Sequence, residues 1–226
     1  MTKTIENLFI YLSAASDLLI ILLFLAFWRK NREDKGLWVI FIYCLLSLLL
    51  NSAVEVLFHN FRHLFYTVFT LLEYLLFSAV LWIYIKNQSF KTLIIVFSVL
   101  FSTFVLFYIG IRGYHRIDSI SIGIETILII IYSFYYLYEE MKNTENLFIY
   151  SKHQFWIITG FLIYLAGSFF IYIFANQVDK DFLLNYWFLT NVFYITKNIF
   201  FTLAILVHLK QLKKNLFNSK LRPYLN

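Results

Sequence analysis

The sequence predicts an all-α membrane protein, a polytopic bundle of seven transmembrane helices with almost nothing outside the bilayer. Of its 226 residues, 61% are hydrophobic and 22% are aromatic, and the mean hydropathy is +0.73. A soluble domain of this size cannot hide so much apolar surface, because its own surface must be wetted by water. Charged residues are only 14% of the chain, and they cluster in short segments between long apolar runs.

Seven apolar runs are each close to the roughly 20 residues that a helix needs to cross the hydrocarbon core. They lie at residues 8–28, 37–57, 64–86, 90–110, 119–138, 154–176 and 186–209. The first run is too long for the apolar part of a signal peptide and ends in Arg29 and Lys30, so we expect it to remain as a helix. The loops are short, which predicts one domain over residues 1–226 with a short basic tail at 210–226.

The distribution of Lys and Arg predicts the orientation. The loops after the first, third and fifth runs and the C-terminal tail hold 13 of these residues, whereas the other side holds 5. Because cytoplasmic loops are enriched in Lys and Arg, we expect the N-terminus outside and the C-terminus in the cytoplasm of a cell with this protein in its inner membrane. The net charge of +6 follows from this asymmetry. It does not indicate nucleic-acid binding, because the basic residues do not gather on a soluble face. The partner of the basic tail is expected to be anionic lipid of the bilayer.

Weak internal sequence similarities suggest that the first three helices are duplicated as the last three, with the fourth helix connecting the two repeats. The third run around Glu73 and the seventh around Lys197 share aromatic, hydroxyl and small positions. The second and sixth runs both have a Trp near their start, and the first and fifth carry an acid near the outer end, Asp17 and Glu125. The alternative is that runs of Phe, Leu and Ile resemble one another by chance.

Polar residues inside the spans are the candidate site residues, because ionisable groups at membrane depth are costly and rare. They are Asp17, Asn51, Glu55, Glu73, Glu125, Asn191, Tyr194, Lys197 and Asn198. With the predicted orientation they fall between the midplane and the outer surface, and the inner half of the bilayer has no comparable set. This bias predicts a polar pocket in the outer half of the bundle.

Lys197 is the sharpest single signal. An ammonium group at mid-membrane needs a carboxylate partner or must give up its proton. Glu73 lies at matching depth and is the first candidate partner, and Asp17 is the second. The pair either only stabilises the bundle or has a functional role, and the sequence leaves both open. Glu55 and Glu125 lie nearer the headgroups, where we expect solvated carboxylates close to a rim.

Asn191 and Asn198 lie seven residues apart on one helix face, with Tyr194 between them. Hydrogen bonding between helices is the expected role of the two amides, ahead of contact with a ligand.

The sequence contains only weak signs of a metal site, a catalytic motif or transporter-type helix packing. His153 and His208 are expected at the cytoplasmic rim, and His59 and His63 on the outer side, where a third ligand is missing, so no metal site is predicted. No HExxH, GxSxG or paired-aspartate motif occurs, so no catalytic residue is predicted. Glycine is scarce, at six residues, which does not favour close-packed or broken transporter helices.

The chain resembles two known classes of membrane protein, one through particular residues and the other through its overall layout. A seven-helix chain with an outside N-terminus, a lysine in the middle of helix seven (Lys197) and a carboxylate in helix three (Glu73) looks like a microbial rhodopsin. That resemblance implies a retinal Schiff base on Lys197 with Glu73 as its counter-ion. The chain departs from the family at Phe193, where an acid four residues before the lysine is usual, and it lacks the helix-three Arg and the helix-six Trp/Tyr/Pro pattern.

The overall layout resembles the seven-helix membrane sensor modules that stand beside or in front of bacterial histidine kinases. Short loops, aromatic-rich helices and a cytoplasmic extension of the seventh helix are typical of that type. The resemblance implies a bacterial signalling or accessory protein, without a cofactor, that acts on a partner such as a histidine kinase. The alternatives are a small transporter or proton-coupled carrier and, third, an intramembrane lipid enzyme.

Overall fold

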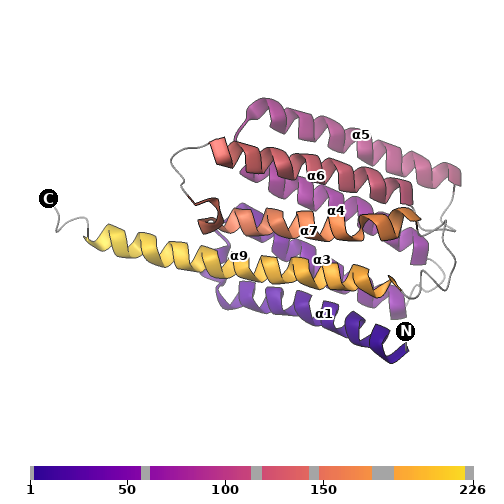
Figure 1. The fold of residues 1–226 in the computed structure, drawn as a ribbon, viewed down its shortest axis with the longest axis horizontal. Coiled ribbons are helices and arrows are strands. Elements are labelled where there is room, and N and C mark those ends of the chain that lie inside the picture. Colours follow the sequence, from indigo (N-terminus) through magenta and orange to yellow (C-terminus); the bar gives the residue numbers. More distant parts are fainter. Residues whose placement is uncertain (1–2, 57–61, 113–118, 143–147, 175–185, 222–226) are drawn as a thin grey trace.

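The protein is a bundle of long α-helices (Figure 1). A computed structural model describes the backbone of residues 3–56, 62–112, 119–142, 148–174 and 186–221, and the side chains of residues 8–50, 64–111, 119–142, 148–174 and 186–214. The elements are α1 (Lys3–Ala26), α2 (Trp28–Asn31), α3 (Lys35–Val56), α4 (Arg62–Tyr84), α5 (Gln88–Arg112), α6 (Ser119–Lys142), the 3₁₀ helix η2 (Ile149–Ser151), α7 (His153–Phe174) and α9 (Phe188–Leu221). These described residues contain no strand, which confirms the all-α prediction.

Six helices of the described part of the chain are long and apolar enough to cross a membrane: α1, α4, α5, α6, α7 and α9. Large apolar side chains such as Leu22, Val99 and Phe134 lie on their outward faces and are exposed by 56%, 61% and 61%. Water would disfavour such a surface, whereas lipid tails are as apolar as the side chains themselves. The outward faces therefore indicate a helical membrane protein, as the composition predicted. In α3, the stretch Lys35–Leu50 is a shorter apolar helix by the same measure.

Six of the helices form a closed ring. Neighbours around it are α1 and α3, α3 and α4, α4 and α6, α6 and α7, α7 and α9, and finally α9 and α1. Helix α5 packs on α4 and α6, and Figure 1 shows it at the edge of the bundle. The inside of the ring is therefore the place where polar groups can be shielded from lipid.

Helices α7 and α9 approach one another closely because two glycines of α7 face α9. A Cβ atom added at Gly160 would lie 3.3 Å from the backbone oxygen of Lys197, and one at Gly167 would collide with the ring of Phe193. Close packing was not expected from so few glycines. Their positions matter more than their number, because small residues let helix backbones approach in a membrane.

Polar contacts fix the end of the bundle where α4 ends and α5 begins. The side chain of Asn87 accepts hydrogen bonds from the first N–H groups of α5, at 2.9 and 3.2 Å, which is a standard N-cap. Glu139 near the end of α6 accepts from the backbone N–H of Lys86 at 2.7 Å. Its neighbour Glu140 pairs with Lys86 at 3.2 Å and with Lys152. This end is the one predicted to face the cytoplasm.

Helix α9 has 34 residues and extends past the other helices in Figure 1. The basic segment expected as a tail from residue 210 therefore begins as a continuation of this helix, up to Leu221. Any displacement of α9 inside the ring would reach that segment directly.

Candidate functional site

Lys197 lies inside the ring, with none of its side chain exposed. Its Nζ donates a hydrogen bond to the hydroxyl of Tyr43 on α3. That hydroxyl in turn donates to Oε1 of Glu73 on α4, at 2.7 Å. The lysine therefore reaches its predicted carboxylate through one tyrosine, and no described carboxylate forms a direct ion pair with it.

Aromatic faces surround the same amine. The ring centroids of Tyr194, Tyr43 and Tyr164 lie 3.7, 4.2 and 4.5 Å from Nζ of Lys197. A cation is attracted to the electron-rich face of an aromatic ring, and more strongly where water is excluded. The sequence predicted acids around the lysine but did not single out Tyr43 and Tyr164, because nothing distinguishes these two among the 17 tyrosines of the chain.

Asp17 on α1 is a second buried carboxyl group, 2% exposed, on the other side of Tyr194. It accepts hydrogen bonds from the Tyr194 hydroxyl at 2.8 and 2.9 Å and from Nδ2 of Asn198 at 2.8 Å. Ser47 of α3 lies 2.5 Å from the same tyrosine hydroxyl. Asp17 is thus joined to α9 and α3, and Asn198 makes bonds between helices of the kind expected for it.

A cavity of about 320 Å³ lies against this cluster. Its walls come from α1, α4, α6, α7 and α9, at the end where α4, α6 and α9 begin and α7 ends. Four of the predicted site residues line it: Glu73, Glu125, Asn191 and Tyr194. Lys197 does not line the cavity and lies behind Tyr194 and Glu73. The cavity therefore lies at the end of the bundle that the sequence predicts to be the outer one.

Glu125 of α6 is 2% exposed and lines the cavity, so it is not the solvated rim carboxylate that we expected. Although it lies within two turns of the start of α6, it faces the ring interior. Its Oε1 has no hydrogen-bond partner among the described residues. A buried polar atom without a partner is costly, so this oxygen is available to accept a hydrogen bond from a group that enters the cavity.

Two candidates cannot be placed in the site. Asn51 and Glu55 belong to the last turns of α3, but their side chains lie outside the described residues. The side chains of His59 and His63 also lie outside the described residues.

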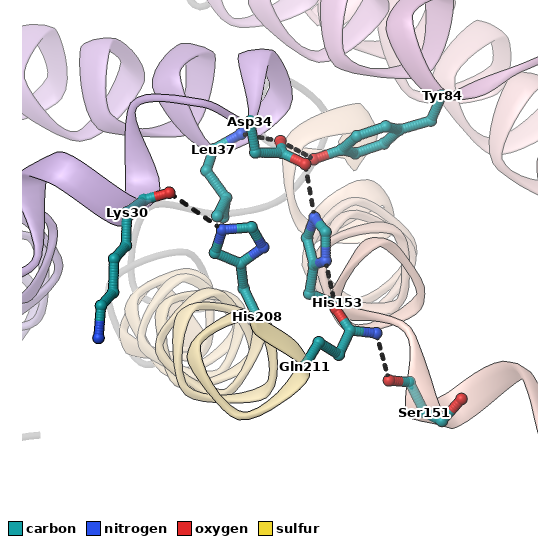
Figure 2. A network of polar contacts seen from close by, with 8 residues as sticks. All are labelled: Lys30, Asp34, Leu37, Tyr84, Ser151, His153, His208 and Gln211. Carbon is teal, nitrogen blue, oxygen red and sulfur yellow. Dashed lines mark hydrogen bonds and ion pairs between the residues drawn. The ribbon is translucent and has the colours of Figure 1, made fainter. Parts of the chain in front are cut away.

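A second polar cluster lies at the opposite end of the bundle (Figure 2). Asp34, between α2 and α3, lies 2.8 Å from Nε2 of His153 at the start of α7, and His208 of α9 lies beside His153. Burial works to raise the pKa of Asp34, but the hydrogen bond and charge of His153, with bonds from the Leu37 N–H and the Tyr84 hydroxyl, lower it to about 2. Asp34 is therefore ionised at neutral pH. The sequence placed both histidines at this rim but gave no reason to join them to Asp34, since the three are far apart in the chain.

Comparison of the chain with protein-family models, with curated proteins and with solved structures finds no match. Both resemblances drawn from the sequence therefore stay predictions.

Proposed function

We propose that this chain is a bacterial inner-membrane sensor or accessory protein of a signalling system. In this proposal, a ligand or a proton binds in the cavity at the outer end of the ring. The resulting change is passed through Tyr194 and Glu73 to Lys197 and so to α9. The basic continuation of α9 then acts on a membrane or cytoplasmic partner, such as a histidine kinase.

The observation that carries this proposal is a double contact. Glu73, Tyr164 and Tyr194 line the cavity and at the same time bind or surround Lys197 or the groups that hold it. A ligand that moves any of them changes the surroundings of a buried cation. Buried charges tolerate few arrangements, so such a change favours a new position of the helix that carries the lysine.

The arrangement of the helices supports seven spans. Helix α3 has 22 residues, which is about 33 Å of helix and close to the thickness of the hydrocarbon core. It takes its place in the ring between α1 and α4. We therefore count α3 as a membrane-spanning helix, which brings the number of spans to seven. The predicted N-terminus outside and C-terminus in the cytoplasm follow from an odd number of spans and the Lys and Arg bias.

The ring also supports an internal duplication. One half consists of α1, α3 and α4, the other of α6, α7 and α9, and α5 lies outside as the joiner. The two halves meet through α4 with α6 and through α9 with α1. Glu73 and Lys197 occupy corresponding helices of the two halves, so the joint between repeats coincides with the polar cluster. Membrane proteins with parallel repeats commonly bind ligands at such a joint.

The test measures the position of α9 when the pocket is altered. Spin labels are attached to cysteines that replace the exposed Gln88 and Lys213, in a Cys44→Ala background in which the only native cysteine, a buried one, is absent. Glu73→Gln mimics a protonated carboxyl, and we expect it to shift the distance between the labels by about 2 Å, the size of helix shifts in known switches. Lys197→Met should also shift it.

Glu33→Gln is the matched control, since Glu33 is an exposed glutamate outside the ring and should leave the distance unchanged. Equal distances in the wild type, Glu73→Gln and Lys197→Met would contradict the proposal.

A proton-coupled carrier is the second candidate, and the unpartnered Oε1 of Glu125 beside Glu73 in the cavity favours it. The carrier would be supported instead if proteoliposomes took up a solute only with a proton gradient and if Glu73→Gln abolished this uptake.

A further inference from the structure

Three side chains from distant parts of the chain meet at the end of the bundle that carries the α9 extension. They are Asp34 from the link between α2 and α3, His153 from α7 and His208 from α9 (Figure 2). One nitrogen or oxygen atom of each lies within 4.8 Å of those of the other two. His153 and His208 are 4% and 7% exposed, and the side chain of Asp34 is 15% exposed. The cluster is therefore largely enclosed and open to solvent on the Asp34 side.

Each histidine has its outward nitrogen bound to an oxygen that can only accept. Nδ1 of His153 lies 3.0 Å from Oε1 of Gln211, and the orientation of that amide is fixed because its Nε2 donates to the carbonyl of Ser151 at 2.7 Å. Nε2 of His208 lies 3.3 Å from the carbonyl oxygen of Lys30. Both outward nitrogens therefore carry a hydrogen.

The inward nitrogens of the two histidines face a common space. Nε2 of His153 points at Asp34, and Figure 2 shows the second ring nitrogen of His208 turned toward His153. A hydrogen bond from the outer N–H to an oxygen, with the inner nitrogen directed at a shared point, is the usual arrangement of metal-binding histidines.

Asp34 is held in the same manner. Its Oδ1 accepts from the N–H of Leu37 at 2.9 Å and from the hydroxyl of Tyr84 at 3.0 Å. Its Oδ2 is the atom that faces His153. All three residues thus have one atom fixed by the protein and one atom directed into the cluster.

We propose that Asp34, His153 and His208 form a binding site for a divalent transition-metal ion of the Zn²⁺ class. Two imidazole nitrogens and one carboxylate oxygen are a donor set that Zn²⁺ accepts, with the fourth position left for water or another ligand. The ion takes the place of the hydrogen between Nε2 of His153 and Oδ2 of Asp34. This inference does not depend on the proposed function of the cavity.

The distances are compatible with such an ion. Donor atoms about 2.1 Å from a tetrahedral Zn²⁺ lie roughly 3.4 Å from one another. The contact of 2.8 Å between His153 and Asp34 must open slightly, and the widest separation, within 4.8 Å, must close by rotation of a side chain. The bound ion would connect α9 and α7 to the link before α3, next to the base of the basic segment.

The experiment uses the full chain, purified in detergent and stripped of metal with a chelator. Co²⁺ is the spectroscopic probe, and Zn²⁺ is then added as the competitor. We expect one equivalent of Co²⁺ to give the visible absorption of a site with nitrogen and oxygen ligands, and Zn²⁺ to abolish it. Asp34→Asn and His208→Gln should each weaken Co²⁺ binding by roughly tenfold or more.

The matched control is the double variant His59→Gln/His63→Gln, which removes the other histidine pair singled out in the sequence and should bind Co²⁺ as the wild type does. Elution on size exclusion and helical circular dichroism report whether each variant is folded, and either ligand variant alone suffices for the test. A wild type without saturable binding would overturn the proposal. So would unchanged binding in a folded Asp34→Asn or His208→Gln variant, or loss of binding in the double variant.

Discussion

At the scale of single residues, the buried lysine dominates the chemistry. Lys197 is fully enclosed, and it is accommodated by three tyrosine rings and by the hydroxyl that connects it to Glu73. Removing one member of a buried charged set is costly, because the charge that remains has neither water nor a partner. Asp17 and Glu73 would be those remaining groups if the lysine lost its charge.

We therefore expect Lys197→Met to lower the free energy of unfolding by about 3 kcal/mol or more, the cost of leaving a buried charge uncompensated. Adding Glu73→Gln to it should restore part of that loss, since the uncompensated carboxylate is then absent. Unfolding in mixed detergent micelles is followed by circular dichroism. It gives the free energies of unfolding of the wild type, the two single variants and the double variant, which together form a double-mutant cycle.

Lys213→Met, an exposed lysine of the same helix, serves as the control and should change stability by no more than about 0.5 kcal/mol. A double variant that loses the full sum of the two single losses would show that Lys197 and Glu73 do not interact.

At the scale of elements, the contact of α7 with α9 positions the lysine. The backbone of Lys197 lies against Gly160, where an added Cβ would also approach Phe200 and Phe201 at 3.2 Å. Any side chain at that position must push the two helices apart or displace the aromatic rings. Because α9 carries Tyr194, Lys197 and Asn198, its separation from α7 would disturb the whole cluster.

Gly160→Val is expected to destabilise the protein by about 1–3 kcal/mol, as overpacking of a well-filled interface does. The chain offers a close control in Gly110→Val, because nothing lies within 4 Å of a Cβ atom at that position of α5. The same substitution should be nearly neutral there. Thermal unfolding of both variants in detergent makes the comparison, and an equal loss in the two would refute the role given to Gly160.

At the scale of the whole molecule, the two ends of the bundle carry different polar groups. The pocket with Glu73 and Glu125 lies at one end, and the ion pairs of Glu140 and the Asp34 cluster lie at the other, where the basic segment of α9 leaves the bundle. The Lys and Arg bias predicts that the second end faces the cytoplasm.

Single cysteines in the Cys44→Ala background test both this orientation and whether α3 crosses the membrane. A membrane-impermeant thiol reagent added to intact spheroplasts should label Asn60→Cys and Lys180→Cys. It should label Glu33→Cys and Lys213→Cys only after the membrane is permeabilised. Labelling of positions 33 and 60 from the same side would show that α3 does not cross.

The sequence by itself determined the class of the protein, because apolar runs of spanning length and scarce charges admit few structures other than a helical membrane bundle. It also selected Glu73, Lys197, Asp17 and Glu125, since charged groups in apolar runs are rare enough to stand out. Only the tertiary structure decided what surrounds them. The ring order of the helices, which periodic apolar runs do not encode, brings Tyr43 and Tyr164 to the lysine and turns Glu125 into the cavity. The meeting of Asp34, His153 and His208 likewise depends on contacts between segments that local patterns in the chain cannot relate.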